Sequence, residues 1–191
     1  MELLIFAESD DKGNLKKDAY EIASYASEIS SENGGSVNAL CFNASNAESL
    51  SDYGVDKIIN SRNEELKNFD PSNYSKCICE VFNNEKCNLL LLSSSSNSKH
   101  IGWILSVLTD SSYVTNVISK LTNGEKMTVV RNTFTNKAIE TVEIIKNKII
   151  LAISKNSFGL KRLYQKQKHV KEERLLMLNQ TGVSTMVQIV F

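Results

Sequence analysis

The sequence predicts an α/β domain in three layers, a parallel sheet with helices on both faces, followed by an antiparallel second half. As far as Leu108, apolar runs alternate with amphipathic stretches, the order typical of strand–helix–strand units. The run Leu89–Leu92 shows no polar alternation, which is typical of a central parallel strand buried on both faces. After Ser112, short strand-like segments follow one another with no helical pattern between them.

The residue pattern of the first half, as far as Leu108, predicts four strands and four helices in alternation. The expected strands are Leu3–Ala7, Val37–Phe42, Lys57–Asn60 and Leu89–Leu92, and the expected helices are Asn14–Ser31, Asn46–Tyr53, Ser72–Phe82 and Ser98–Leu108. Gly34 and Gly35 end the first helix and Gly54 ends the second, because glycine accepts the backbone angles found just past a helix. Asp70 followed by Pro71 is a typical helix start, since Asp caps the free N–H groups and Pro suits the first turn.

The second half predicts a group of antiparallel strands. They are expected at Val114–Ser119, Lys126–Phe134, Ala138–Ile145 and Lys148–Ser154. Asn123-Gly124 and Lys146-Asn147 supply the turns between them.

We expect one domain over residues 1–158 and a C-terminal tail over 159–191 that combines a charged helix with an apolar strand-like tip. The charged segment is Lys161–Arg174, and its basic residues alternate with acidic ones, which favours a solvated helix face over a nucleic-acid patch. The tip, Met186–Phe191, must be buried against its own sheet or a partner, because a free apolar end promotes aggregation.

Composition points away from nucleic acid and membranes as partners. The 191 residues carry 22 basic and 22 acidic side chains, and no apolar run reaches the roughly 20 residues of a membrane helix. The first strand begins at Leu3, which leaves no room for a targeting segment and predicts a cytoplasmic protein. Cys77 and Cys79 lie two apart in a predicted helix and point to different faces, so reduced thiols are expected rather than a zinc site.

A ligand crevice is predicted at the carboxyl ends of the first strand and of Leu89–Leu92, where an open α/β sheet normally binds ligands. The candidate residues for a phosphate, carboxylate or nucleotide are Glu8, Ser9, Ser94, Ser96, Ser98 and Lys99. The alternative is a cluster of capping serines beside a solvated lysine, with no ligand. No glycine-rich phosphate loop and no nucleophile–base signature is present, so no catalytic residue is predicted. Trp103 is expected in the core or at an interface.

Several segments resemble the electron transfer flavoprotein alpha subunit over Leu3–Phe158. The first strand ends in Ala7-Glu8, and Tyr53-Gly54-Val55-Asp56-Lys57-Ile58 is similar to that family's Tyr-Gly-Ala-Asp-Lys-Val segment. Tyr113-Val114-Thr115-Asn116-Val117 is similar to its Val-Thr-Asp-Val segment. The resemblance implies a Rossmann-like fold of the adenine-nucleotide alpha-hydrolase-like kind.

The chain also departs from that family. The usual Thr-Gly-Arg segment before the fourth helix is replaced by Asn97-Ser98-Lys99, and the Gly-Asn pair by Asn136-Lys137. The glycine-rich segments of the family's FAD-binding second domain are absent from the sequence. The resemblance therefore places no FAD site on any residue of this chain.

Three functional hypotheses follow. The first is a scaffold or assembly module in electron transfer, which pairs with a beta-like subunit or with a second copy of itself. The second is a stand-alone binder of AMP, another adenine nucleotide or a small anion, through the predicted crevice. The third is an electron carrier that holds FAD at a subunit interface.

Overall fold

The structure is a computed structural model that describes residues 1–163, 173–178 and 184–190. The strands are β1 (Leu3–Phe6), β2 (Val37–Phe42), β3 (Lys57–Arg62), β4 (Leu89–Ser93), β5 (Ser112–Val117), β6 (Thr122–Asn123), β7 (Met127–Thr133), β8 (Ala138–Ile144), β9 (Ile149–Ile153), β10 (Glu173–Leu178) and β11 (Ser184–Val190). The α-helices are α1 (Lys17–Asn33), α2 (Pro71–Asn84) and α3 (Ser96–Leu108), and the short 3-10 helices are η1 (Ala47–Tyr53) and η2 (Glu64–Leu66). Among the described residues, no helix is long and apolar enough to cross a membrane.

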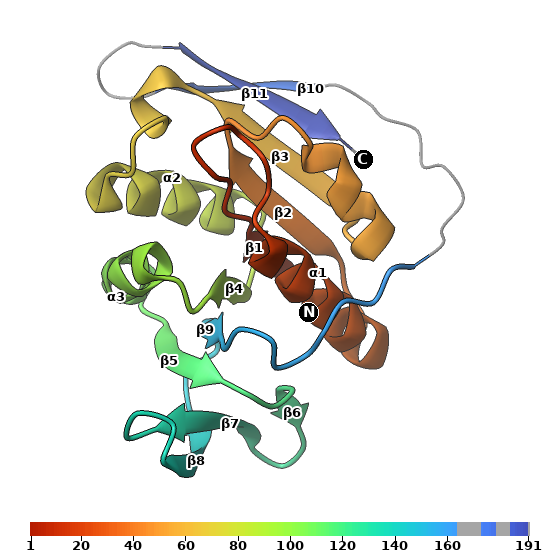
Figure 1. The fold of residues 1–191 in the computed structure, drawn as a ribbon, viewed down its shortest axis with the longest axis vertical. Coiled ribbons are helices and arrows are strands. Elements are labelled where there is room, and N and C mark those ends of the chain that lie inside the picture. The colour runs from red at the N-terminus through yellow and green to blue at the C-terminus, as the bar shows by residue number, and fades with distance from the viewer. Residues whose placement is uncertain (164–172, 179–183, 191) are drawn as a thin grey trace.

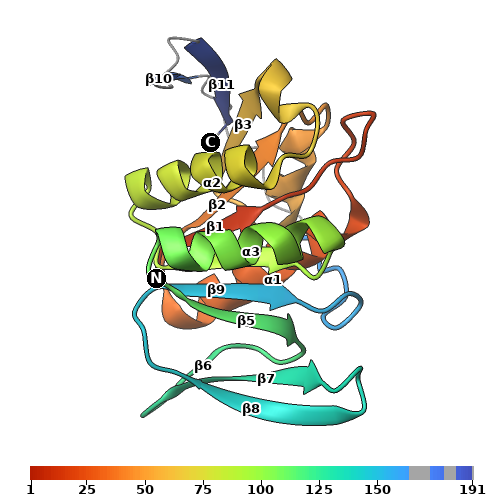
Figure 2. The ribbon, with the colours of Figure 1, turned by 90° about the vertical axis from the view of Figure 1, so that its left-hand side faces the viewer.

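The predicted α/β fold class is confirmed. The strands form one mixed sheet in which β3, β2, β1, β4, β9 and β5 lie side by side and run parallel. Helices α2 and α3 cover one face and α1 covers the other (Figures 1 and 2). The parallel part therefore has the three predicted layers.

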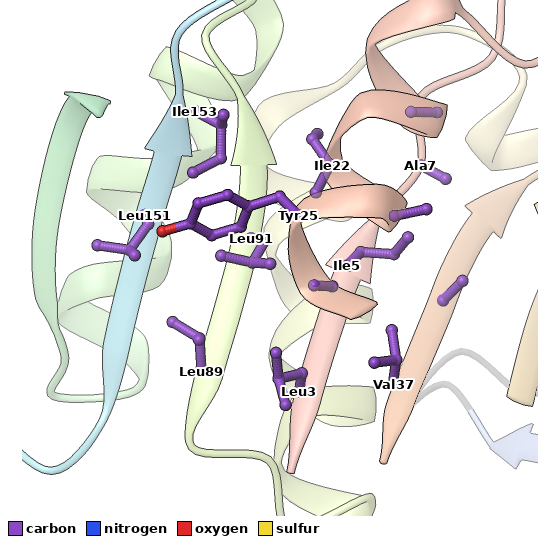
Figure 3. Close-up of a cluster of buried hydrophobic side chains, with 14 of the residues drawn as sticks. Leu3, Ile5, Ala7, Ile22, Tyr25, Val37, Leu89, Leu91, Leu151 and Ile153 are labelled. Carbon is purple, nitrogen blue, oxygen red and sulfur yellow. The ribbon is translucent and has the colours of Figure 1, made fainter. Parts of the chain in front are cut away.

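Two apolar cores fill the spaces between the sheet and its helices. Successive residues of a strand point to opposite faces, so Leu3 and Ile5 pack toward α1 while Leu4 and Phe6 pack toward α2 and α3. Figure 3 shows Tyr25 of α1 lying over Leu91 and Leu151 in the first of these cores. Burial on both faces explains why the central strands are apolar throughout.

The predicted element boundaries hold best where a cap fixes them. The Asp70 side chain accepts the backbone N–H of Asn73 at 2.7 Å and begins α2, as predicted. The first helix begins three residues later than expected, at Lys17 rather than Asn14. Asn14 is held in a turn instead, because its N–H donates to the Asp10 carboxylate at 2.8 Å.

The second half differs from the prediction at β5, β6 and β9. β7 and β8 pair antiparallel as expected, whereas β6 lies where a turn and no strand was predicted. In contrast, β9 lies between β4 and β5 and runs parallel to both, so it belongs to the parallel sheet. The turn at Lys146-Asn147 does not form a hairpin between β8 and β9, because β9 finds its partners farther away.

The segment that follows β9 runs along α1 (Figure 1). Lys155 forms an ion pair with Asp18 at 2.9 Å. The buried carboxylate of Glu21 accepts the backbone N–H groups of Asn156 and Phe158, both at 2.9 Å. These contacts fix the path of the chain as far as Leu163, whose N–H donates to the Asp52 carbonyl at 2.7 Å.

Beyond Leu163, the described parts of the tail are strands. Most of the predicted charged helix, Lys161–Arg174, lies outside the described residues, but its last two residues begin β10 and are therefore not helical. The predicted apolar tip contains most of β11, which pairs antiparallel with β3 in the register Ile189↔Ile59. The tip thus adds a strand to its own sheet.

Candidate functional site

The candidate site lies where β1 and β4 end beside each other. This is the switch point of the sheet. β2 and β3 lie on one side of β1, whereas β4, β9 and β5 lie on its other side. Glu8 follows β1, and Ser93 ends β4 just before α3. The sequence analysis predicted a crevice at this switch point.

The Glu8 carboxylate is enclosed by hydrogen-bond donors. Its Oε1 atom accepts hydrogen bonds from the hydroxyl groups of Ser93 at 3.0 Å, Ser98 at 2.5 Å and Ser95. Its Oε2 atom accepts a hydrogen bond from Nζ of Lys16 at 2.8 Å, and Lys16 is the residue just before α1. Glu8 is 7% exposed and the Lys16 side chain 37% exposed, so a buried carboxylate surrounded by hydroxyl groups is paired with a partly exposed ammonium group.

Opposing effects set the charge state of this carboxyl group. Burial raises the pKa of Glu8, while the hydrogen bonds from Lys16, Ser95 and Ser98 lower it. The net pKa lies below the ordinary value, so Glu8 is a stable anion near neutral pH.

The structure brings together only two of the six predicted site residues, Glu8 and Ser98. The Ser9 hydroxyl donates to the Phe42 carbonyl at 2.9 Å, and the Ser94 hydroxyl donates to the Ala152 carbonyl at 3.3 Å. Ser96 and Lys99 are exposed on the first turn of α3. Whether any of these residues binds a ligand stays a prediction.

The sequence analysis missed three members of the cluster, Ser93, Ser95 and Lys16. Ser95 also caps α3, since its Oγ atom accepts the Ser98 N–H at 3.0 Å. A run of serines directly after a buried strand was the available signal, but it does not reveal which hydroxyl groups point inward. Lys16 was missed because the helix was expected to begin at Asn14, which placed Lys16 inside the helix rather than just before it.

Little space remains beside the buried carboxylate. A cavity of about 30 Å³ touches Glu8, Ser9 and Tyr74, which is about the volume of one water molecule. A larger hollow of about 310 Å³ lies over the loops that follow β1 and β2 and reaches Lys12, Lys16 and Phe69.

Two exposed apolar surfaces lie elsewhere on the molecule. On α3, Trp103 is 62% exposed and Val107 81% exposed, so Trp103 is not in the core and only the interface part of its prediction remains open. On the outer hairpin, Ile139 of β8 is 69% exposed and Ile145 is 88% exposed. Among the described residues, β8 pairs only with β7, and its other edge is open.

The described part of the chain shows no group of His, Cys, Asp or Glu side chains that could hold a metal ion. All four cysteines are free thiols. Burial raises the pKa of Cys77 and of Cys87 to about 11, so neither thiol is a ready nucleophile.

Comparison with known proteins identifies the family. The electron transfer flavoprotein subunit alpha of Clostridium acetobutylicum is 28% identical over 102 residues. This match covers 51% of the present chain and 30% of that subunit. The family model of the electron transfer flavoprotein domain matches residues 3–175, which include the parallel sheet, the Glu8 cluster and the outer hairpin. The chain therefore belongs to the electron transfer flavoprotein domain family.

Proposed function

We propose that this chain is an alpha-type assembly module of an electron transfer flavoprotein, which pairs with a beta-type subunit through the open edge of β8. The observation that carries the proposal is this edge, because the outer edge of β8 pairs with no strand in the part of the chain that the structure describes, and the protein belongs to this family. An open edge strand invites pairing with a strand of another chain.

The side chains around β8 support an interface at this edge. Ile139 and Ile145 leave apolar surface in water at both ends of the strand, and Phe134 at the β7–β8 turn is 77% exposed. β8 contains Glu140 and Glu143 and no basic residue, which disfavours pairing with its own copy, because like charges across neighbouring strands are destabilising. A different partner chain is therefore favoured over a homodimer.

The test is co-expression with the electron transfer flavoprotein beta subunit of the same organism, followed by size-exclusion chromatography with light scattering. We expect a one-to-one complex. Ile139→Lys combined with Ile145→Lys should weaken it at least tenfold, because both side chains would carry charge into an apolar contact. Val107→Lys on α3 is the matched control, since it also replaces an exposed apolar residue but lies away from β8.

The outcomes separate the hypotheses. A complex that survives the β8 double variant but is lost with Val107→Lys would move the interface to α3. A homodimer that excludes the beta subunit would contradict the proposal. The absorbance spectrum of the purified complex tests the third hypothesis, because a flavin held at the subunit interface would make the complex yellow.

The nucleotide-binding hypothesis ranks second. One of its predicted donors, the Ser98 hydroxyl, already donates to Glu8 in this structure. A rise in melting temperature with AMP would restore it.

A further inference from the structure

The Glu8 cluster is arranged as an anion site that already contains its anion. Three hydroxyl groups, from Ser93, Ser95 and Ser98, all donate their protons to one carboxylate oxygen. Lys16 donates to the other oxygen from the start of α1. Hydroxyl groups and an ammonium group around a buried negative charge form the same set of donors that binds a phosphate group in other proteins.

An external anion would meet three obstacles at this position. Each of the three hydroxyl protons is already used, and a hydroxyl group has only one to donate. The remaining cavity, about 30 Å³, has no room for a phosphate group with its attached ligand. The buried carboxylate would also repel a second negative charge at close range in a medium of low polarity.

We propose that Glu8 is a built-in anion that occupies the oxyanion position at the switch point and closes it to phosphate-bearing ligands. The proposal goes beyond the assembly role and does not depend on it. The larger hollow fits this assignment, because its walls include Lys12 and Lys16 but none of the three serines that hold Glu8. A molecule in that hollow would lie outside the enclosed carboxylate.

The test removes the internal anion and offers a replacement. Glu8→Ala leaves a void the size of a small carboxylate beside the free hydroxyl groups and Lys16. Titration of this variant with sodium formate or sodium phosphate should raise its melting temperature in a saturable way, by roughly 3 °C or more, relative to sodium chloride at equal ionic strength. The wild-type protein should show no such rise with formate, phosphate or AMP.

Glu8→Gln is the matched control. It removes the charge but fills the same volume, so we expect no saturable response to any of these anions. A folded Glu8→Ala protein that does not respond to formate or phosphate would overturn the proposal, as would an equal response from Glu8→Gln.

The wild-type titration is decisive on its own if Glu8→Ala is recovered only unfolded. A saturable rise with phosphate or AMP that persists in a Lys12→Ala variant, in which the outer hollow has lost a cation, would then show that the position is open and that the proposal is wrong. An unchanged melting temperature would support a closed site.

Discussion

The carboxylate of Glu21 on α1 accepts the backbone N–H of Phe158 at 2.9 Å, across 137 residues of sequence. The other oxygen of the same carboxylate accepts the N–H of Asn156. Asn156 has a positive φ of 58°, so the backbone leaves the extended conformation here, and its N–H donates to Glu21 rather than to a strand. Glu21 therefore takes the place of a strand partner and fixes the segment that leaves the parallel sheet.

Replacing Glu21 should release this segment. We expect Glu21→Ala to lower the free energy of unfolding by about 2 kcal/mol, because two backbone N–H groups lose a charged acceptor. Urea denaturation measures the loss, and limited trypsin digestion at Lys155 and Lys161 should become faster. Glu32→Ala is the control on the same helix. Its ion pair with Lys120 is partly exposed and does not involve the released segment, so its loss should cost about 0.5 kcal/mol.

Tyr25 and Tyr113 should respond in opposite ways to loss of the hydroxyl group. The Tyr25 hydroxyl donates to the Ser119 carbonyl at 3.2 Å and accepts the Leu121 N–H at 3.1 Å. Tyr25→Phe should therefore cost about 1 to 2 kcal/mol. The Tyr113 hydroxyl is buried and finds no hydrogen-bond partner among the described residues, so Tyr113→Phe should be neutral or slightly stabilising. Equal losses in the two variants, measured by thermal unfolding, would contradict this account.

Gly102 in α3 should not tolerate a side chain, although alanine normally favours a helix by about 1 kcal/mol over glycine. A Cβ atom at this position would lie 2.3 Å from Cζ of Tyr113, so the ring must move. We expect Gly102→Ala to destabilise the protein by about 1 to 3 kcal/mol. The rings of Trp103 and Tyr113 meet edge to face, with their centroids 5.0 Å apart. The fluorescence of this sole tryptophan should therefore also change. In a Tyr113→Val background the same substitution should become harmless.

Acid should weaken the fold partly through Glu8. Its pKa in the folded protein lies below the ordinary value of 4.5, so the unfolded chain binds a proton there more readily. The resulting stability is present above about pH 4.5 and is lost as the pH falls through the lower, folded-state pKa. Glu8→Gln should therefore have a shallower loss of unfolding free energy below pH 4.5 than the wild-type protein in a urea series. If the two proteins lose unfolding free energy in parallel as the pH falls, other carboxyl groups, such as that of Asp10, cause the acid sensitivity.

Local patterns predicted the fold better than the site. The apolar run at β4 and the Asp70 cap depend on neighbouring residues, and both predictions are confirmed. The position of β9 depends on strand pairing between distant segments, which periodicity does not encode. At the site, the Ala7-Glu8 segment correctly marked the end of β1. The direction of each serine hydroxyl depends on where α3 begins, and one residue of difference turns a side chain to another face.

The position of β9 between β4 and β5 also bears on how the chain folds during synthesis. β4 and β5 are synthesised first, and the strands β6, β7 and β8 are synthesised before β9 can insert between them. Until Ile149–Ile153 leaves the ribosome, the leucine-rich strand β4 has no partner on that side, and β5 has no place in the parallel sheet. A nascent chain at this stage exposes the edge of an apolar strand. The hairpin of β7 and β8, built from local contacts, can fold early and hold the chain close enough for β9 to insert.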